Sequence, residues 1–351
     1  MSPRAFIQQL AWFATGLLLL FIACSVHYMI LSRRDNMTRQ LAIFASARPE
    51  FLVLGDSHPA MNVDMRTLGP RYATLAYPQE NWREIFLKAR YALAAKREIR
   101  GVVIPVDLHM FAAYRAEDSG MTNSMRFTRA YADLEPLYRS PLFPLRYLKS
   151  LIVYYVPLCL GPNWSNYRGL VLDDIQDAFA DHAPRKRIEI DNFGTIYYSD
   201  GKTFADLPRV TREAAAHTRA GELFRPPNDS ESLVRAFDAF LGLCAERHIA
   251  VVGVRYPLTS EVQRAATAYD IRPAEEVYRK RGARMAAILD YTHLMDSAPR
   301  SFRDEDHLTR AGARAFTRVL GRDLDHVWGR LAMPGEARVA GNASAGRVAG
   351  D

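Results

Sequence analysis

The chain has 351 residues, of which 49% are hydrophobic and 24% are charged, and its formal net charge is +7. This length allows one large or two modest domains with a sizeable core. The positive charge comes from scattered arginines without a long basic run or an aromatic platform motif, which argues against a nucleic-acid-binding protein. Its three cysteines, Cys24, Cys159 and Cys244, show no metal-ligand spacing and define no disulfide framework.

An apolar segment near the amino terminus predicts a membrane anchor. From Leu10 to Leu31 the sequence contains no Asp, Glu, Lys or Arg, and Trp12 and Tyr28 lie near its ends. At about 1.5 Å per residue, such a helix crosses the ~30 Å hydrocarbon core of a bilayer. A buried core helix and a cleaved signal peptide are the alternatives, but the run is long for a signal peptide and no Ala-x-Ala site follows it. We therefore expect a flank over 1–9 and a transmembrane helix over 10–31.

Arginines lie on both sides of this predicted anchor. Arg4 precedes it, and Arg33, Arg34, Arg39 and Arg48 follow it. The positive-inside bias taken alone places the large domain in the cytoplasm, whereas long domains can translocate largely regardless of charge. Charge therefore leaves the orientation open.

Residues 32–48 are polar and arginine-rich, with a short helical pattern at Leu41, Ile43 and Phe44, and we interpret them as a juxtamembrane stalk. After this stretch, short apolar runs alternate with helical patterns. This alternation is typical of a parallel sheet with crossover helices. Pro105 within the third strand suggests a bulge or an edge position. The predicted strands are Glu50–Leu54, Tyr72–Ala76, Gly101–Val106, Ile249–Val254 and Ala287–Tyr291. The predicted helices are Asn81–Ala95, with Asn81 and Glu84 as a capping box, Ser230–Arg247, Ala274–Arg284 and Arg310–Leu324.

The strand–helix alternation stops over about 108–227, which we interpret as an insertion large enough to roof a site. Within it, Arg187–Ile190 and Thr195–Tyr198 flank a turn sequence and predict a hairpin. The α/β domain is expected over 49–330. The remaining tail, 331–351, is rich in Gly, Ala, Val and Arg without periodicity and is expected to be disordered.

The first predicted strand runs directly into Gly55-Asp56-Ser57-His58, a polar turn that presents one hydroxyl. Open α/β sheets place their chemistry at the carboxyl ends of the strands. Ser57 needs a base to act as a nucleophile, and His307 follows the fifth strand and so lies at the same edge. Asp304 precedes His307 by three residues and can orient its imidazole and stabilise the imidazolium.

Each of these residues also has a simpler interpretation. Ser57 can be a turn residue, His307 a surface or capping histidine, and Asp304 the N-cap of the last helix. The sequence suggests that His58 is a loop residue and that Asp306, adjacent to His307, points elsewhere. Three further histidines do not form a metal-ligand set by their spacing: His217, His248 and His293.

The chain resembles the SGNH/GDSL hydrolase superfamily over about residues 49–325. The resemblance is carried by Gly55-Asp56-Ser57 early in the chain, Asp304-x-x-His307 late in it and five alternating strands between them. The stretch Phe302-x-Asp304-x-Asp306-His307-Leu308-x-x-x-Gly312-Ala313 resembles the membrane-anchored branch associated with O-acylation of cell-surface polysaccharides, which includes teichoic-acid D-alanyl-transfer and alginate-acetylation proteins.

The resemblance implies a flavodoxin-like three-layer α/β/α domain with a parallel five-stranded sheet, and a Ser57-His307-Asp304 triad without a metal or other cofactor. It implies an extracytoplasmic, for example periplasmic, site beside the membrane lipid bilayer. The substrate would be a polysaccharide or an acyl ester, and the partner a multi-pass membrane O-acyltransferase.

The chain departs from this superfamily where the oxyanion donors are expected. The superfamily uses a glycine after strand two and an asparagine after strand three, in addition to the backbone N–H of the serine. Here the two loops read Tyr77-Pro78-Gln79-Glu80-Asn81 and Val106-Asp107-Leu108-His109. Asn81 is a candidate substitute donor, whereas an ionised Asp107 cannot donate and is expected to bond loop N–H groups. Arg255, after strand four, can bind an anionic substrate group or form an ion pair.

Asp107 and His109 also invite comparison with an Asp-x-His pair of related alginate-modifying proteins, although a structural role fits them as well. The sequence as a whole predicts a membrane-anchored serine acyl-ester hydrolase or O-acyltransferase that acts on a cell-surface polysaccharide. The alternatives are a catalytically weak or inactive scaffold that binds glycan or a membrane O-acyltransferase, and a cytoplasm-facing lipid or thioester hydrolase.

Overall fold

The computed structural model describes residues 2–32, 36–116, 168, 171–172, 188–198 and 203–332. Most of the predicted insertion and the tail beyond residue 332 lie outside these residues. Disorder of the tail therefore stays a prediction.

Five parallel strands form the central sheet in the order β2-β1-β3-β6-β7. All five predicted strands are confirmed, with ends that agree to one or two residues. Parallel sheets are buried on both faces, so their strands are short apolar runs that sequence analysis locates easily. The strands are β1 (Phe51–Val53), β2 (Tyr72–Thr74), β3 (Gly101–Pro105), β6 (Ala250–Arg255) and β7 (Ala287–Asp290).

The edge position or bulge expected from Pro105 is wrong. Strand β3 lies in the middle of the sheet, paired with β1 on one side and β6 on the other, and its register with β6 is regular up to Pro105 and Val254. The proline is tolerated because it is the last residue of the strand. Pairing continues beyond it through the N–H of Val106, which donates to the carbonyl of Val254 at 2.9 Å.

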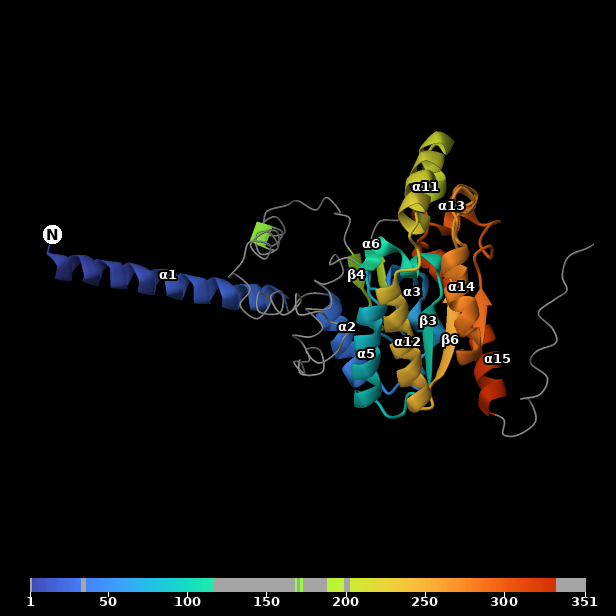
Figure 1. Cartoon of the computed structure of the whole chain (residues 1–351), viewed down its shortest axis with the longest axis horizontal. Helices are drawn as coiled ribbons and strands as arrows, with labels where there is room; N and C mark the ends of the chain where they lie inside the picture. Colours follow the sequence, from blue (N-terminus) through green and yellow to red (C-terminus); the bar gives the residue numbers. More distant parts are fainter. Residues whose placement is uncertain are drawn as a thin grey trace, which may run out of the picture.

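Side chains alternate between the two faces of the sheet and enter two hydrophobic clusters. Leu52 and Val102 belong to one cluster together with α5 (Trp82–Ala95), α12 (Glu231–Glu246) and α14 (Arg272–Arg281). Phe51 and Val103 belong to the other, together with α15 (Arg310–Ala332). Figure 1 shows α5 and α12 side by side on one face of the sheet. Both faces of the sheet are therefore covered by helices.

These helices are close to those predicted. The capping box of Asn81 and Glu84 is present at the start of α5, and α15 extends beyond the expected end at Leu324. The hairpin is confirmed as the antiparallel pair β4 (Ile188–Ile190) and β5 (Ile196–Tyr198). The described residues also form shorter and peripheral helices: α3 (Ser57–Asn62), α4 (Met65–Leu68), η1 (Leu108–Phe111), α6 (Ala113–Ala116), α11 (Arg209–Phe224) and α13 (Ser260–Ala266).

The interpretation of residues 32–48 as a stalk is wrong for most of that segment. Residues Asn36–Ser46 form α2, an amphipathic helix whose Leu41 and Phe44 side chains are buried in the domain core. The buried amide of Gln40 donates to the carbonyls of Ala76 and Gly194, which ties the helix to the chain after β2 and to the hairpin loop. The folded domain therefore begins near residue 36 rather than 49.

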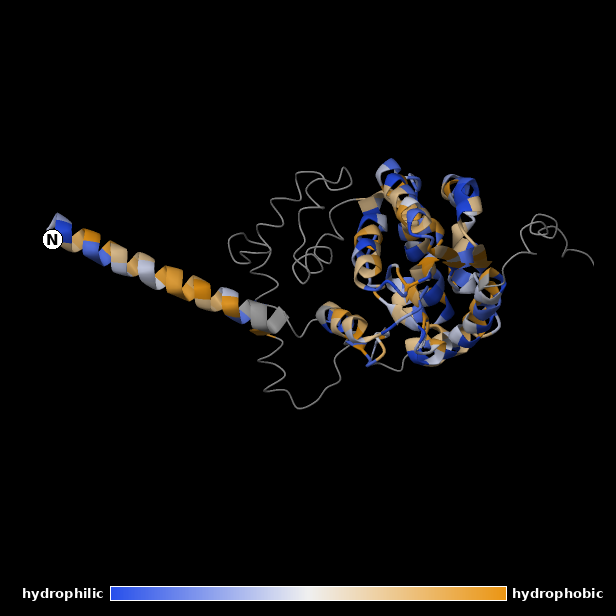
Figure 2. Cartoon of the chain, turned by 90° about the horizontal axis from the view of Figure 1, so that it is seen from below, coloured by the Kyte–Doolittle hydropathy of each residue, from blue (hydrophilic) through white to orange (hydrophobic). Residues whose placement is uncertain are grey.

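The amino-terminal helix α1 (Pro3–Ser32) is separate from this domain (Figure 1). Its stretch Pro3–His27 is apolar and long enough to cross a membrane, and none of that stretch is buried by the rest of the chain. Figure 2 shows the apolar residues along the middle of the helix. The predicted apolar helix is confirmed, and its length and composition fit either a single membrane span or a signal sequence.

Candidate active site

Ser57 is the first residue of α3, directly after β1, and its side chain is partly exposed. The turn that places it there depends on Gly55, whose φ of +139° is one that residues with a Cβ rarely adopt. A Cβ on Gly55 would also lie 2.6 Å from Pro105 Cδ and 2.6 Å from Pro59 Cγ. Only glycine fits this position, so β1, the end of β3 and α3 together hold the serine in place.

His307 lies in the loop between β7 and α15, and Asp304 is its partner. The Nδ1 atom of His307 is 2.9 Å from Asp304 Oδ1, which also accepts the backbone N–H of His307 at 2.8 Å. Burial would lower the pKa of His307, but the carboxylates of Asp304 and Asp306 raise it above its usual value. Asp304 is not the N-cap of the last helix, because α15 begins at Arg310 and the hydroxyl of Thr309 accepts the N–H of its first turn.

The Nε2 atom of His307 is buried and has no hydrogen-bond partner within the part of the chain that the structure describes. It therefore does not bond to Ser57 Oγ. Both residues follow parallel strands of the same sheet, and the ring of His58, which is next to Ser57 in the chain, lies 5.5 Å from the ring of His307, centroid to centroid. Catalytic hydrogen bonds are often long without substrate and tighten when it binds.

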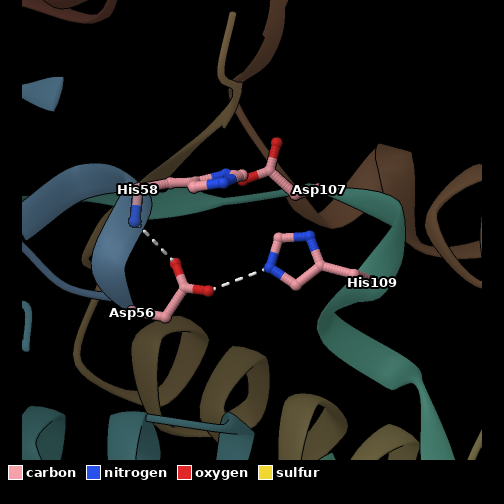
Figure 3. Close-up of side chains that lie close together, drawn as sticks. All are labelled: Asp56, His58, Asp107 and His109. Atoms are coloured by element: carbon pink, nitrogen blue, oxygen red, sulfur yellow. Dashed lines mark hydrogen bonds and ion pairs between the residues drawn. The ribbon is translucent and has the colours of Figure 1, made fainter. Parts of the chain in front are cut away.

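The sequence suggested that His58 is a loop residue, and this is wrong. His58 is a buried residue in the first turn of α3. Its Nδ1 atom is 2.8 Å from Asp107 Oδ2, and its Nε2 atom is 3.1 Å from Asp306 Oδ2. Burial opposes a charge on this ring, but Asp107 and Asp306 raise the pKa of His58 well above its usual value. Figure 3 shows His58 against Asp107, beside the pair formed by Asp56 and His109.

From its position in the sequence, Asp306 was expected to point away from His307, and this is wrong. Its Oδ1 atom is 3.3 Å from His307 Nδ1, while its Oδ2 atom faces His58 and accepts hydrogen bonds from Arg219 of α11 at 2.7 and 2.9 Å. Burial would raise the pKa of Asp306, but His307, Arg219 and His58 lower it well below its usual value. One carboxylate thus links the candidate base to His58 and Arg219.

A second buried carboxylate supports the turn before Ser57. Asp56 Oδ2 is 2.9 Å from His109 Nε2 and 2.8 Å from an Arg115 nitrogen, and Asp56 Oδ1 accepts the N–H of His58. Burial would raise the pKa of Asp56, but Arg115 and His109 lower it far below its usual value. Asp56 is therefore an ionised N-cap of α3, and its counter-ion, Arg115, comes from the chain after β3.

The three candidate oxyanion or substrate-binding residues are all engaged elsewhere. Asn81 caps α5 through its Oδ1 atom, and its Nδ2 atom donates to the carbonyl of Arg115 at 2.8 Å. Asp107 accepts the N–H of Tyr256 at 2.9 Å, as expected for a carboxylate that bonds loop N–H groups. Arg255 is paired with Asp290, 3.3 Å away. The substrate-binding interpretation of these residues is therefore not supported, because their polar atoms already have partners.

Four buried side chains offer ligand atoms within 4.8 Å of one another, a spacing that a metal ion can use: Asp56, His58, Asp107 and His109. Their present contacts do not fit a metal, however. The guanidinium of Arg115 already bonds Asp56, and both ring nitrogens of His58 face carboxylates. A divalent cation would have to displace these partners and would lie close to a fixed positive charge. We therefore assign no metal ligand here.

A pocket of about 400 Å³ lies between α11 and the loop that carries His307. It is lined on one side by α11 residues that include Thr218, Arg219 and Glu222, and on the other by Asp304, Glu305, Asp306 and His307. The lining side chains are polar apart from Ala215, half of the lining residues are acidic, and Arg219 is already paired to Asp306. Such a pocket suits hydroxyl-rich, uncharged groups better than anionic ones.

Sequence analysis located Ser57, Asp304 and His307 but missed the polar network behind them, which includes His58, Arg115 and Arg219. One signal was present: Asp56-x-His58 follows β1 and Asp107-x-His109 follows β3. The two strands are not consecutive in the chain, so their adjacency becomes evident only from the order β2-β1-β3. The repeated Asp-x-His pattern and the strand order together predict that the two pairs lie next to each other.

No known protein-family model matches the chain, and no curated protein matches it. The resemblance to the SGNH/GDSL superfamily therefore rests on the residues alone: Ser57 after the first strand, and Asp304 with His307 after the last.

Proposed function

We propose that the protein is a membrane-anchored serine acyl-ester hydrolase or O-acyltransferase of the SGNH type, acting on a cell-surface polysaccharide. One observation carries the proposal. At the sheet edge where Ser57 is presented, His307 is oriented by Asp304 through Nδ1, and its Nε2 atom is left without a partner among the described residues.

In the proposed reaction, Ser57 Oγ attacks the acyl carbonyl while His307 Nε2 takes its proton. Asp304 stabilises the imidazolium and keeps Nε2 directed to the serine. The leaving alcohol takes the proton from His307, and an acyl ester remains on Ser57. A sugar hydroxyl or water then gives its proton to His307 and attacks this ester. Ser57 Oγ leaves, takes the proton back from His307 and releases the acylated sugar or the free acid.

Further features support this proposal. The strand order and the burial of both sheet faces agree with the flavodoxin-like three-layer arrangement of the superfamily. The pocket beside His307 is polar and suits the hydroxyl groups of a sugar. The apolar helix α1 would keep the site near a lipid-linked acyl donor or a multi-pass O-acyltransferase.

Covalent labelling tests the nucleophile. Full-length protein in detergent is treated with a fluorophosphonate probe, and the modified residue is located by peptide mass spectrometry. We expect labelling at Ser57 and its complete loss in Ser57→Ala. Ser260→Ala is the matched control, because Ser260 also begins a helix after a parallel strand but is not part of the Asp304–His307 site. A wild-type chain that is never labelled, under conditions that label a control esterase, refutes the nucleophile.

A non-catalytic scaffold is the second candidate function. It is favoured by the engagement of Asn81 and Asp107, which leaves the site without the side-chain oxyanion donor of the superfamily. Loss of one such donor lowers the rate by about 10² to 10³-fold. In cells that lack the protein, a scaffold predicts that Ser57→Ala restores glycan acylation fully, whereas a chain without α1 does not.

A further inference from the structure

His58 connects two loops at the carboxyl edge of the sheet. One of its ring nitrogens faces Asp107, which follows β3, and the other faces Asp306, in the loop before α15, at 2.8 and 3.1 Å. Both partners are carboxylate oxygens, which only accept hydrogen bonds when ionised. A neutral imidazole donates from a single nitrogen, so both contacts can form only if the ring is an imidazolium.

The surrounding charges agree with an imidazolium. Four carboxylates line this region, Asp56, Asp107, Asp304 and Asp306. Among the described residues three guanidinium groups lie against them, Arg115 on Asp56, Arg219 on Asp306 and Arg303 on Asp304. The other groups that face His58 are the rings of His109, His307 and Tyr256. Buried carboxylates need compensation, and a proton on His58 supplies it between Asp107 and Asp306.

We propose that His58 is a positioning residue whose imidazolium holds Asp306 against the ring of His307. Asp306 Oδ2 is held by His58 and Arg219, which directs Oδ1 to His307 Nδ1 at 3.3 Å. His307 Nδ1 thus faces two carboxylates, Asp304 and Asp306, and the charge of the second is offset by His58. The inference rests on the proposed function only in taking His307 as the base.

The fixed cation keeps His307 available as a base near neutral pH. With the two ring centroids 5.5 Å apart, a charge on His58 disfavours a second charge on His307. Without it, Asp306 keeps its pair with Arg219 but loses the cation next to His307, so its negative charge acts more strongly on His307. At an effective dielectric constant of about 20, we expect the pKa of His307 to rise by more than about one unit. A protonated His307 cannot take the proton of Ser57.

The charge state of His58 can be measured without any turnover. Full-length protein with ¹⁵N-labelled histidine is studied by NMR in detergent, and its nine histidines are assigned with single variants. We expect both ring nitrogens of His58 to stay protonated from pH 6 to 8. A neutral His58 ring in this range overturns the proposal. So does a stoichiometric divalent metal in the purified chain that His58→Gln removes, because a metal would then hold the carboxylates.

The effect on His307 is tested with His58→Gln, which keeps one donor but removes the charge. We expect the pKa of His307 to rise by more than about one unit and the pH midpoint of Ser57 labelling to rise with it. His109→Gln is the matched control, because this equally buried histidine bonds Asp56 and not Asp306, and it should leave His307 unchanged.

An unchanged His307 pKa in folded His58→Gln contradicts the positioning role. If that variant does not fold, the wild-type ring measurement still decides the charge state of His58. Absence of Ser57 labelling in the wild type counts against the proposed function alone, because the titration of His307 does not depend on it.

Discussion

The ring of His307 has two carboxylate neighbours, and only one of them needs to orient it. Asp304 lies closer, at 2.9 Å, and also accepts the backbone N–H groups of His307 and Asp306, whereas Asp306 is 3.3 Å from the same ring nitrogen and is shared with Arg219. Geometry therefore makes Asp304 the orienting residue and Asp306 a link to the network behind it.

Replacing Asp304 tests this division of roles. In Asp304→Asn the amide oxygen can keep the two backbone hydrogen bonds, but the amide can no longer stabilise an imidazolium. We expect the rate of fluorophosphonate labelling of Ser57 to fall by about 10³ to 10⁴-fold with little loss of fold, as in triads that lose their carboxylate. The measurement is the labelling rate at fixed pH, with far-UV circular dichroism as the check on folding. An undiminished rate would identify Asp306 as the orienting residue instead.

Gly55 is the position where the turn before Ser57 tolerates no side chain. Gly55→Ala adds a Cβ at 2.6 Å from two proline side chains and requires alanine at a φ of +139°. Strain and overpacking together predict a loss of about 2 to 4 kcal/mol in the free energy of unfolding. Urea unfolding measures this loss. Gly242→Ala, in the middle of α12 with open space around it, is the control and should stabilise the protein by about 0.5 to 1 kcal/mol.

Sequence analysis could predict a functional residue where the residues that identify it lie close to it in the sequence. Ser57 after an apolar run, and Asp304 three residues before His307, are such cases. Arg219 and Arg115 could not be found in this way, because their partners lie far away in the sequence, Asp306 and Asp56 respectively. The donor role expected for Asn81 is not supported, for a related reason. Its capping role was visible locally, but its bond to the carbonyl of Arg115 was not.

Among the elements, α2 shows that the domain extends into the segment taken for a stalk. We predict that Leu41→Ala lowers the free energy of unfolding by about 2 to 5 kcal/mol, because Leu41 is 2% exposed and packs in the main core. Ala42→Ser, on the exposed side of the same helix, should change it by less than about 0.5 kcal/mol. Equal small effects in chemical denaturation would mean that α2 is a stalk after all.

The fold itself was largely predictable at this scale, because period and composition are local properties. Apolar runs marked every strand of the main sheet, and the helical spacing of Leu233, Phe237 and Leu241 marked α12. The amphipathic pattern of α2 was visible too, but only tertiary contacts such as those of Gln40 show that the helix belongs to the domain. The inference of an edge strand or bulge from Pro105 failed because the rule on proline was applied to the whole strand. A proline is excluded from the interior of a central strand but not from its last position.

At the scale of the whole molecule, the position of the domain relative to the membrane depends on α1. The bias of arginines after the helix favoured a cytoplasmic domain, but the structure weakens that inference. Arg39 lies in α2, where its guanidinium donates to Asn192 at 3.0 Å, so it belongs to the folded domain rather than to a short loop beside the membrane. Long domains translocate largely regardless of such charges.

We therefore predict that the domain lies outside the cytoplasm, where a cell-surface polysaccharide is accessible. A reporter enzyme that is active only outside the cytoplasm, fused after Ala332 at the end of α15, should be active in the full-length chain. The same fusion without residues 1–32 should be inactive and soluble, because it lacks the apolar helix. A second reporter that works only in the cytoplasm should give the reverse pattern. Activity of this second reporter in the full-length fusion would exclude a surface polysaccharide as the substrate and would favour a lipid or thioester hydrolase facing the cytoplasm.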